Sequence, residues 1–418
     1  MKQRQKWRTY LVVNGKALEW IEEAEQDLKE AFSAVEKIEF ILQERVLNAF
    51  AENRVSARHF APTEGYGYDD IGRDCLDKVF AAAMEAEDAL VRPQIANGTH
   101  AIFLVLSAAL QPGEKILSLT GAPYDTLETA IGLRGDVKNS LKRLGITFDC
   151  ITSFEENKVA EKIVDPTVRM VYVQRSRGYT SREAISVENM RICFAHIKRL
   201  RPDICIFVDN CYGEFTELHE PCAVGADLVA GSLIKNPGGG LAPTGGYVAG
   251  AARYVEQVAN CQTVPGCGRE IGSYAASYRP YYQGLFMAPH TVCQCLKTAM
   301  LFAKVFERMG FASSPNALAG RSDIIQSVTF ETKEQLLAFC VAIQAASPVD
   351  SFAVPEPWDM PGYADPVVMA AGAFVQGATT ELSCDAPIRP PYTAYLQGSL
   401  TYAHGRLAVA KALKALWN

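Results

Sequence analysis

The chain changes its pattern of hydrophobic and polar positions twice along its length. Residues 17–53 place apolar side chains at helical spacing among Glu, Lys and Ala, which predicts a helical arm. Residues 60–75 interrupt this period with glycines and a proline. From about residue 92, short runs rich in β-branched residues alternate with amphipathic segments. This alternation predicts a mostly parallel sheet with helices on its faces.

The same pattern predicts where individual elements begin and end. The predicted strands of the sheet are residues 115–119, 146–152, 168–174, 204–209, 227–234 and 246–250. The predicted helices are residues 74–87, 100–110, 125–132, 187–200, 291–309 and 403–417. Residues 322–330 and 392–397 are strand candidates of a second, smaller α+β portion, and the proline-rich residues 348–366 are a predicted loop. We therefore expect an N-terminal arm and interface loop (1–75), a large α/β domain (76–290) and a smaller C-terminal α+β domain (291–418).

Composition narrows the class of protein without naming it. The 418 residues are 49% hydrophobic and carry a net charge of −6, which argues against a general nucleic-acid binder. The longest apolar run, residues 101–110, is about half of what a membrane span needs. The 12 cysteines include no Cys-x-x-Cys motif and no zinc spacing, so we expect free thiols, no metal site and a reducing compartment. These features predict a cytoplasmic protein without nucleic-acid or membrane partners.

Two residues at strand ends predict the chemistry. Asp209 ends the apolar run 204–208, and Lys235 follows the next apolar run in the sequence Gly231-Ser-Leu-Ile-Lys-Asn-Pro-Gly-Gly-Gly240. A pyridoxal-phosphate (PLP) site needs a lysine that bonds to the cofactor aldehyde and an acid that keeps the pyridine nitrogen protonated. Lys235 and Asp209 fit these roles, and we expect an apolar setting to lower the pKa of Lys235. The alternative for Asp209 is a cap of the next turn.

A phosphate cup is predicted upstream, where Gly98, Thr99 and His100 open a helix. Backbone N–H groups, a hydroxyl and the positive end of the helix dipole all favour a phosphate there, although Gly-Thr before a helix is commonly only a cap. Ser232 can reach the same phosphate, and the imidazole of His100 is a candidate for stacking on the pyridine ring. The glycine-rich residues 238–246 match neither a Walker loop nor a dinucleotide fingerprint.

An amino-acid substrate also needs a partner for its carboxylate. Arginine is the usual choice because its guanidinium binds a carboxylate through two parallel hydrogen bonds. Arg389 lies beside the Pro390-Pro391 pair, which stiffens the backbone, and is the first candidate. Arg406 is the second.

The whole set of segments resembles a known superfamily. The segments that carry the resemblance are residues 65–74, 91–100, 207–215, 235–250 and 381–405. Together they are similar to fold-type I PLP enzymes of the cystathionine/methionine gamma-lyase superfamily, and most closely to its aluminium-resistance group. The resemblance implies the PLP-dependent transferase fold and a homodimer or homotetramer with the active site at the subunit interface. Tyr66 and Tyr68 match the loop that reaches the neighbouring subunit's phosphate in related lyases, whereas His100 stands where those lyases carry a tyrosine.

The expected activity follows from this combination. We expect a PLP-dependent carbon–sulfur lyase that acts on a cystathionine- or methionine-type amino acid and releases a thiol, ammonia and a 2-oxo acid. Lys235 would remove the α-proton, with Asp209 and His100 as the other catalytic residues. The alternatives are an aminotransferase, which would release no net ammonia, and a non-catalytic PLP-binding protein.

Overall fold

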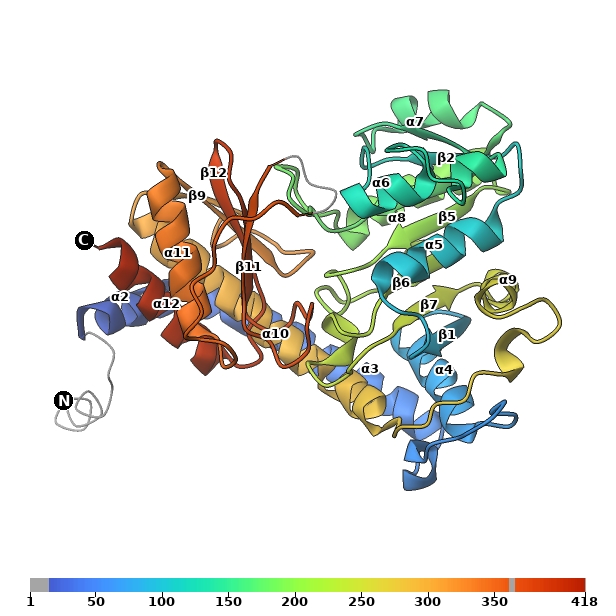
Figure 1. Ribbon diagram of the computed structural model, residues 1–418, viewed down its shortest axis with the longest axis horizontal. Helices are drawn as coiled ribbons and strands as arrows, with labels where there is room; N and C mark the ends of the chain where they lie inside the picture. Colours follow the sequence, from blue (N-terminus) through green and yellow to red (C-terminus); the bar gives the residue numbers. More distant parts are fainter. Residues whose placement is uncertain (1–14, 361–364, 418) are drawn as a thin grey trace. The chain divides into compact units, whose positions relative to one another are not determined.

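The computed structural model describes residues 15–360 and 365–417, which divide into two compact units (Figure 1). One unit is Phe40–Pro289, and the other combines the described residues before and after that segment. The boundaries fall inside two long helices, α3 (Lys29–Glu52) and α10 (Arg279–Arg308). The domain limits expected from the sequence stay predictions.

The unit Phe40–Pro289 is built on a sheet of seven strands. These are β1 (Asp88–Arg92), β2 (Lys115–Ser118), β3 (Thr147–Cys150), β4 (Val168–Gln174), β5 (Cys205–Asp209), β6 (Leu228–Ser232) and β7 (Gly246–Gly250). Their order is β1-β7-β6-β5-β4-β2-β3. The neighbouring pairs β3–β2, β2–β4, β4–β5 and β5–β6 are parallel. Strand β7 runs antiparallel to both β6 and β1. The mostly parallel sheet is confirmed, and β1 is the strand that the sequence pattern did not predict.

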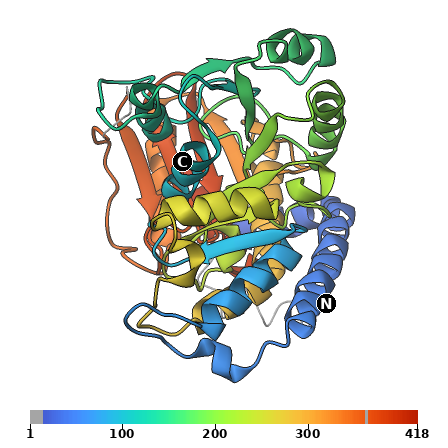
Figure 2. The same ribbon diagram turned by 90° about the vertical axis from the view of Figure 1, so that its right-hand side faces the viewer.

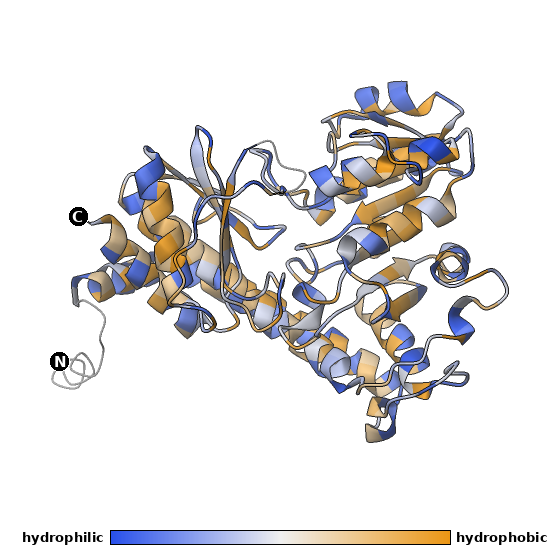
Figure 3. Cartoon of the chain, in the orientation of Figure 1, coloured by the Kyte–Doolittle hydropathy of each residue, from blue (hydrophilic) through white to orange (hydrophobic). Residues whose placement is uncertain are grey.

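Helices cover this sheet. They are α4 (Ile71–Ala83), α5 (Gly98–Ala109), α6 (Asp125–Ile131), α7 (Glu156–Ile163), α8 (Val187–Leu200) and α9 (Ala252–Gln262). Helix α5 packs on β6, β7 and α9, while α4 and α9 both contact β1 (Figures 1 and 2). Ile102 and Val105 of α5 belong to one buried cluster with Leu228 and Val248 of the strands. Figure 3 shows the hydrophobic residues gathered where α5 and the central strands meet. Burial of this cluster fixes the start of α5 at the edge of the sheet.

The largest departures from the predicted helix bounds are in the N-terminal arm and at the start of α10. The predicted arm is two helices, α2 (Gly15–Asp27) and α3, which meet at Leu28. The helix predicted from residue 291 begins at Arg279 and continues through Pro289. Pro280 lies in the first turn of α10, where the missing N–H costs nothing because no partner exists for it. Proline inside a helix removes one hydrogen bond and crowds the preceding turn, but packing can carry a helix through it. The pattern alone therefore placed the start too late.

The other unit is an α+β arrangement. It contains α11 (Lys333–Ala346), α12 (Tyr402–Leu416) and the strands β8 (Ala312–Ser314), β9 (Ile325–Phe330), β10 (Val367–Ala371), β11 (Ser383–Pro387) and β12 (Tyr392–Gln397). The strands pair antiparallel in the order β10-β11-β12-β9-β8, and α11 packs on four of them. The smaller α+β portion expected from the sequence is thus confirmed as an antiparallel sheet with helices. Within the described ranges, none of the helices has the length and apolar character that crossing a membrane requires.

Candidate functional site

The polar residues of interest lie at one edge of the large sheet. Strands β4, β5 and β6 are parallel neighbours, so their carboxyl ends share this edge. Gln174 pairs with Asp209 in register, and Ser232 is the last residue of β6. In open α/β sheets, ligands bind beyond the carboxyl ends of the strands. The topology therefore brings Asp209 and Ser232 to the edge where a ligand is expected.

Asp209 is a buried carboxylate with few donors around it. The backbone N–H of Cys211 donates to its Oδ1 at 3.1 Å, and the hydroxyl of Tyr172 lies 3.4 Å from its Oδ2. Burial raises the pKa of Asp209, while the charge of Lys235 lowers it. A carboxyl group in this setting is stabilised as an anion only by a nearby cation. Lys235 is one such cation, and a protonated ring nitrogen would be another.

Lys235 follows β6 and its ammonium lies over an aromatic ring. Its Nζ is 3.8 Å from the centre of the Tyr212 ring, which is a favourable cation–π distance. Tyr212 has a φ of +71°, a left-handed conformation that turns the chain sharply after Asp209. The side chain of Asn236 holds this turn by donating to the carbonyl of Tyr212 at 3.0 Å. The two loops that carry Asp209 and Lys235 are thereby tied together.

We expected a lowered pKa for Lys235, and this expectation was wrong for the protein without cofactor. Burial does lower the pKa of Lys235, but Cys211, Tyr212 and Asp209 around it raise the pKa by more. This rise could not be predicted from the sequence, because these groups meet Lys235 through the pairing of β5 with β6. Lys235 is therefore a cation at neutral pH and must lose a proton before it can act as a nucleophile or a base.

The N-terminus of α5 points its first residues at the end of β6. A side chain at Gly98 would place its Cβ 3.3 Å from the Cβ of Ser232 and 3.2 Å from the Sγ of Cys211. The hydroxyl of Ser232 is buried and has no hydrogen-bond partner among the described residues. An unpaired buried hydroxyl beside a helix N-terminus is suited to an anion such as a phosphate.

The helix begins two residues earlier than predicted. Asn97 is its N-cap, and its side chain accepts a hydrogen bond from the backbone N–H of His100 at 2.8 Å. Thr99, which the sequence pattern favoured as the cap, instead accepts a hydrogen bond from the hydroxyl of Tyr124 at 2.9 Å. Asn is as good a cap as Thr, and the pattern could not separate them because they lie two residues apart.

Two rings lie beside this helix N-terminus. The Nδ1 of His100 accepts a hydrogen bond from the backbone N–H of Ala96 at 3.1 Å, so a neutral His100 carries its proton on Nε2. Burial lowers the pKa of His100, which favours this neutral form. Burial raises the pKa of Tyr124 most, and the charges of Asp209 and Lys235 act on it as well. The stacking role expected for His100 therefore has a second candidate in Tyr124.

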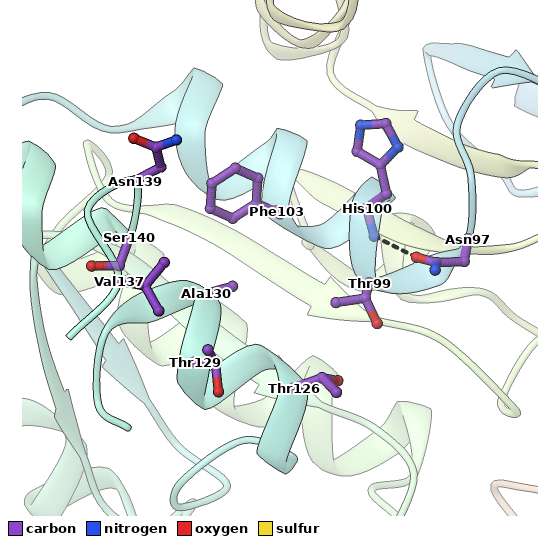
Figure 4. Close-up of a pocket in the computed structure, with 10 residues that line it drawn as sticks. All are labelled: Asn97, Thr99, His100, Phe103, Thr126, Thr129, Ala130, Val137, Asn139 and Ser140. Atoms are coloured by element: carbon purple, nitrogen blue, oxygen red, sulfur yellow. Dashed lines mark hydrogen bonds between the residues drawn. The ribbon is translucent and has the colours of Figure 1, made fainter. Parts of the chain in front are cut away.

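A pocket of about 420 Å³ adjoins this N-terminus (Figure 4). It lies between α5 and α6 and is closed on one side by the residues that follow α6. Thr99 points toward Thr126 across it, while the ring of His100 extends on the other side of α5 from Thr129 and Ala130. The pocket gives a small molecule room to approach Thr99 from solvent.

Tyr66 and Tyr68 lie on an ordered loop that exposes both rings. Their side chains are 70% and 63% exposed, and the two rings stack with their centres 5.5 Å apart. The loop backbone is fixed from within its own unit: Arg73 donates to the carbonyl of Gly67 at 2.9 Å and the N–H of Gly272 to that of Tyr66 at 3.0 Å. Among the described contacts, no hydrogen bond or ring pair joins either tyrosine to Lys235. Their expected role toward a neighbouring subunit stays a prediction.

The two candidate arginines belong to the other unit, and each has an acidic partner. Arg389 lies 3.1 Å from the carboxylate of Asp365 and its side chain is 55% exposed. Arg406 pairs with Glu25 through Nε at 2.8 Å and Nη2 at 3.1 Å. Either guanidinium would have to exchange its partner to bind a substrate carboxylate, so the expected role of both remains a prediction.

Sequence reasoning missed the residues that complete the site. Tyr124 is the N-cap of α6, Tyr172 lies in β4, and Cys211 lies in the turn after β5. No local motif marks Tyr124 or Tyr172, because tertiary packing brings Tyr124 to Thr99 and strand order brings Tyr172 to Asp209. Cys211 lies two residues after Asp209, and its backbone N–H donates to that carboxylate. Tyr172 could have been found from its place in the strand that pairs with β5, because parallel pairing brings residues of β4 close to Asp209.

Comparison with known proteins identifies the family. The sequence model of the methionine gamma-lyase family matches residues 17–417. The chain belongs to the methionine gamma-lyase family. The resemblance inferred from the sequence is thereby confirmed. A relative in this family, the uncharacterized protein YnbB of Bacillus subtilis, is 46% identical over 399 residues, covering 94% of this chain and 95% of the relative.

Several solved structures share the fold of this chain. A Listeria monocytogenes protein, provisionally described as a cystathionine beta-lyase involved in aluminum resistance, has a TM-score of 0.94 at 45% identity. The match covers 96% of this chain and all of that one (100%). A carbon-sulfur lyase involved in aluminum resistance from Clostridium novyi NT has a TM-score of 0.93 at 44% identity, covering 99% of each chain. The PLP-dependent protein YhfS of Escherichia coli, 14% identical with a TM-score of 0.61 over 92% of this chain and 97% of its own, shares the fold. The fold is thus fold-type I, as the sequence predicted.

A side chain at position 98 should weaken cofactor binding, because a Cβ there would lie close to Ser232. Gly98→Val would fill the space beside the Ser232 hydroxyl, so a phosphate-bearing cofactor should bind at least about tenfold more weakly. Titration of purified protein with PLP, followed by visible absorbance, measures this. Gly320→Val is the matched control, because nothing lies within 4 Å of a Cβ at that position. Equal PLP affinity in the Gly98 variant and the control would contradict a phosphate site there.

Proposed function

We propose that this chain is a PLP-dependent carbon–sulfur lyase that acts on a sulfur-containing amino acid of the cystathionine or methionine type. The observation that carries the proposal is the meeting of Asp209, Lys235 and the unpaired Ser232 hydroxyl at one sheet edge, facing the N-terminus of α5. Membership of the methionine gamma-lyase family supports the same activity. The name of the Clostridium novyi relative, a carbon-sulfur lyase, supports it as well.

The residues at this edge fit PLP. Gly98, Thr99 and Ser232 would hold the phosphate: the helix N-terminus supplies backbone donors and Ser232 supplies a buried hydroxyl that lacks a partner. Asp209, whose pKa is raised by burial, would be held as an anion by a protonated pyridine nitrogen. When bound, PLP withdraws electron density from the α-carbon of an amino acid and so makes its α-proton acidic.

Lys235 is the residue we assign to bond with the cofactor and to move protons. Its Nζ lies over the Tyr212 ring, within reach of the charge of Asp209. Because the surrounding groups raise its pKa, Lys235 is charged in the chain alone and loses a proton when the cofactor occupies the site. As a free amine, Nζ would take the α-proton of the substrate and return a proton to the product.

Two rings compete for the stacking position on the cofactor. His100 is the candidate from the sequence, and its neutral imidazole is suited to stacking. Tyr124 is the second candidate, because its pKa responds to both Asp209 and Lys235, whereas the pKa of His100 responds to burial alone. We therefore keep both His100 and Tyr124 as candidate cofactor contacts.

A second copy of the chain would complete the site. Tyr66 and Tyr68 are two large exposed rings on a loop whose shape is already fixed by Arg73 and Gly272. An ordered loop that exposes adjacent aromatic rings is suited to a protein interface, where such residues are enriched. We propose a homodimer or homotetramer in the cytoplasm in which these tyrosines approach the neighbouring copy's phosphate cup.

Turnover tests the proposed activity. The purified protein, supplied with PLP, is mixed in turn with L-cystathionine, L-methionine and L-cysteine, and ammonia, thiol and 2-oxo acid are measured. We expect equal amounts of the three products from at least one of these amino acids. A substrate-dependent spectral change without ammonia, reversed by a 2-oxo acid, would instead identify an aminotransferase and contradict the lyase assignment.

Arg389 should clamp the substrate carboxylate. Arg389→Ala should raise KM at least about tenfold, since hydrogen bonds to charged groups contribute about 1.5–3 kcal/mol. Its PLP affinity should stay unchanged, because the phosphate cup lies in the other unit. Arg406→Ala is the comparison variant; a larger rise in KM for that variant would transfer the role to Arg406.

A further inference from the structure

Glu214 is a buried carboxyl group that the proposed reaction does not use. It lies five residues after Asp209 and is fully buried (0% exposed). The hydroxyl of Tyr247 in β7 donates to its Oε1 at 2.8 Å. Its Oε2 is buried and has no hydrogen-bond partner among the described residues. An ionised Glu214 would leave one charged oxygen buried without a hydrogen-bond donor. A protonated carboxylic acid carries no charge, so burying its unpaired oxygen costs less.

The carboxyl group rests against the strand that leads to the cofactor-binding residues. A Cβ on Gly231 would lie 2.6 Å from the Oε1 of Glu214 and 2.6 Å from the Cε1 of Tyr247. Any side chain at position 231 would therefore displace this pair. Gly231 directly precedes Ser232, so the position of Glu214 bears on the placement of the Ser232 hydroxyl.

The backbone around Glu214 is also joined to the loop that carries Lys235. The side-chain amide of Asn236 donates to the carbonyl of Glu214 at 2.9 Å and to that of Tyr212 at 3.0 Å. Asn236 follows Lys235 directly, and the ring of Tyr212 lies under the Lys235 ammonium. A shift of Glu214 would thus move both the ring and the lysine above it.

The charges facing Glu214 oppose its ionisation more than they favour it. Burial raises the pKa of Glu214 to about 8, and the negative charge of Glu220 adds to the rise. A hydrogen bond from its own backbone, the hydrogen bond from Tyr247 and the charge of Lys235 lower the pKa. Cys211 also faces Glu214, and burial raises the pKa of that thiol. The side-chain amide of Asn210 donates to the Oε2 of Glu220 at 2.9 Å, and the Nη1 of Arg175 lies 3.7 Å from the same oxygen. These partners favour the carboxylate form of Glu220, so it offers Glu214 no proton.

We propose that Glu214 is a positioning residue that works as an uncharged carboxylic acid, holding the turn after Asp209 against β6, and that its ionisation loosens the cofactor site. This inference rests on the proposed PLP site for its effect on cofactor binding. Its first part, the neutral state of Glu214 in the folded chain, can be tested without any cofactor.

The direction of the pH effect follows from linkage. Because the pKa of Glu214 is raised in the folded state, its contribution to stability is fully present below its unfolded pKa and is lost as pH rises toward about 8. Glutamine has the shape of the protonated acid and cannot ionise. The ratio of folded to unfolded protein should therefore shift in favour of Glu214→Gln by up to about tenfold per pH unit between about pH 5 and pH 8, and then level.

The experiment compares four proteins: the wild type, Glu214→Gln, Glu214→Ala and, as a control, Glu331→Gln at an exposed glutamate. Urea unfolding of each cofactor-free protein is measured at several pH values. We expect the Gln variant to gain on the wild type as pH rises, the Ala variant to be less stable at every pH, and the control to follow the wild type. Parallel pH profiles for the wild type and Glu214→Gln, or a Gln variant that does not fold, would overturn the neutral state.

The second measurement is the dissociation constant of PLP, from visible absorbance, for the wild type and Glu214→Gln. The wild type should lose affinity relative to the Gln variant as pH passes about 8. A ratio of the two constants that does not change with pH would overturn the link between Glu214 and the cofactor site. If the wild type binds no PLP at any pH, the proposed function fails, while the unfolding comparison still decides the state of Glu214.

Discussion

The burial of the Asp209 carboxylate at the end of β5 is the constraint on which the site depends. The surrounding protein supplies the N–H of Cys211 and the distant hydroxyl of Tyr172, and it holds Lys235 nearby. An anion with so little compensation is expensive to bury, so the fold is stable only if a cation stays close. Lys235 fulfils this role in the chain alone. A protonated pyridine nitrogen would take it over in the loaded protein and free Lys235 for chemistry.

The large sheet turns this requirement into a site. Parallel pairing places the ends of β5 and β6 side by side, which brings Asp209 together with Ser232 and the loop that carries Lys235. Helix α5 packs its apolar face on β6 and β7, and this fixes its N-terminus beside Ser232. The phosphate cup therefore depends on the same core packing that stabilises the sheet. Glu214 and Asn236 add a second layer behind it by joining the two loops.

Much of this arrangement could be predicted from the sequence, for a physical reason. Asp209 and Lys235 each follow an apolar run, and strand ends in a parallel sheet must meet at one edge. The sequence could not predict which rings surround them, because Tyr124 reaches Thr99 through tertiary packing and no fixed spacing records that. The raised pKa of Lys235 was missed for the same reason. The early start of α10 was missed because Pro289 resembles a helix boundary in sequence, although packing carries the helix through it.

The proposed reaction requires that Lys235 bonds to PLP. The most direct measurement is to saturate the purified protein with PLP, reduce it with borohydride to make any lysine–cofactor bond permanent, and locate the added mass by peptide mass spectrometry. We expect a phosphopyridoxyl group on the peptide that contains Lys235, and no such group on that peptide in a Lys235→Ala variant. An unmodified Lys235 in PLP-saturated protein, or the same extent of labelling spread over exposed lysines, would contradict it.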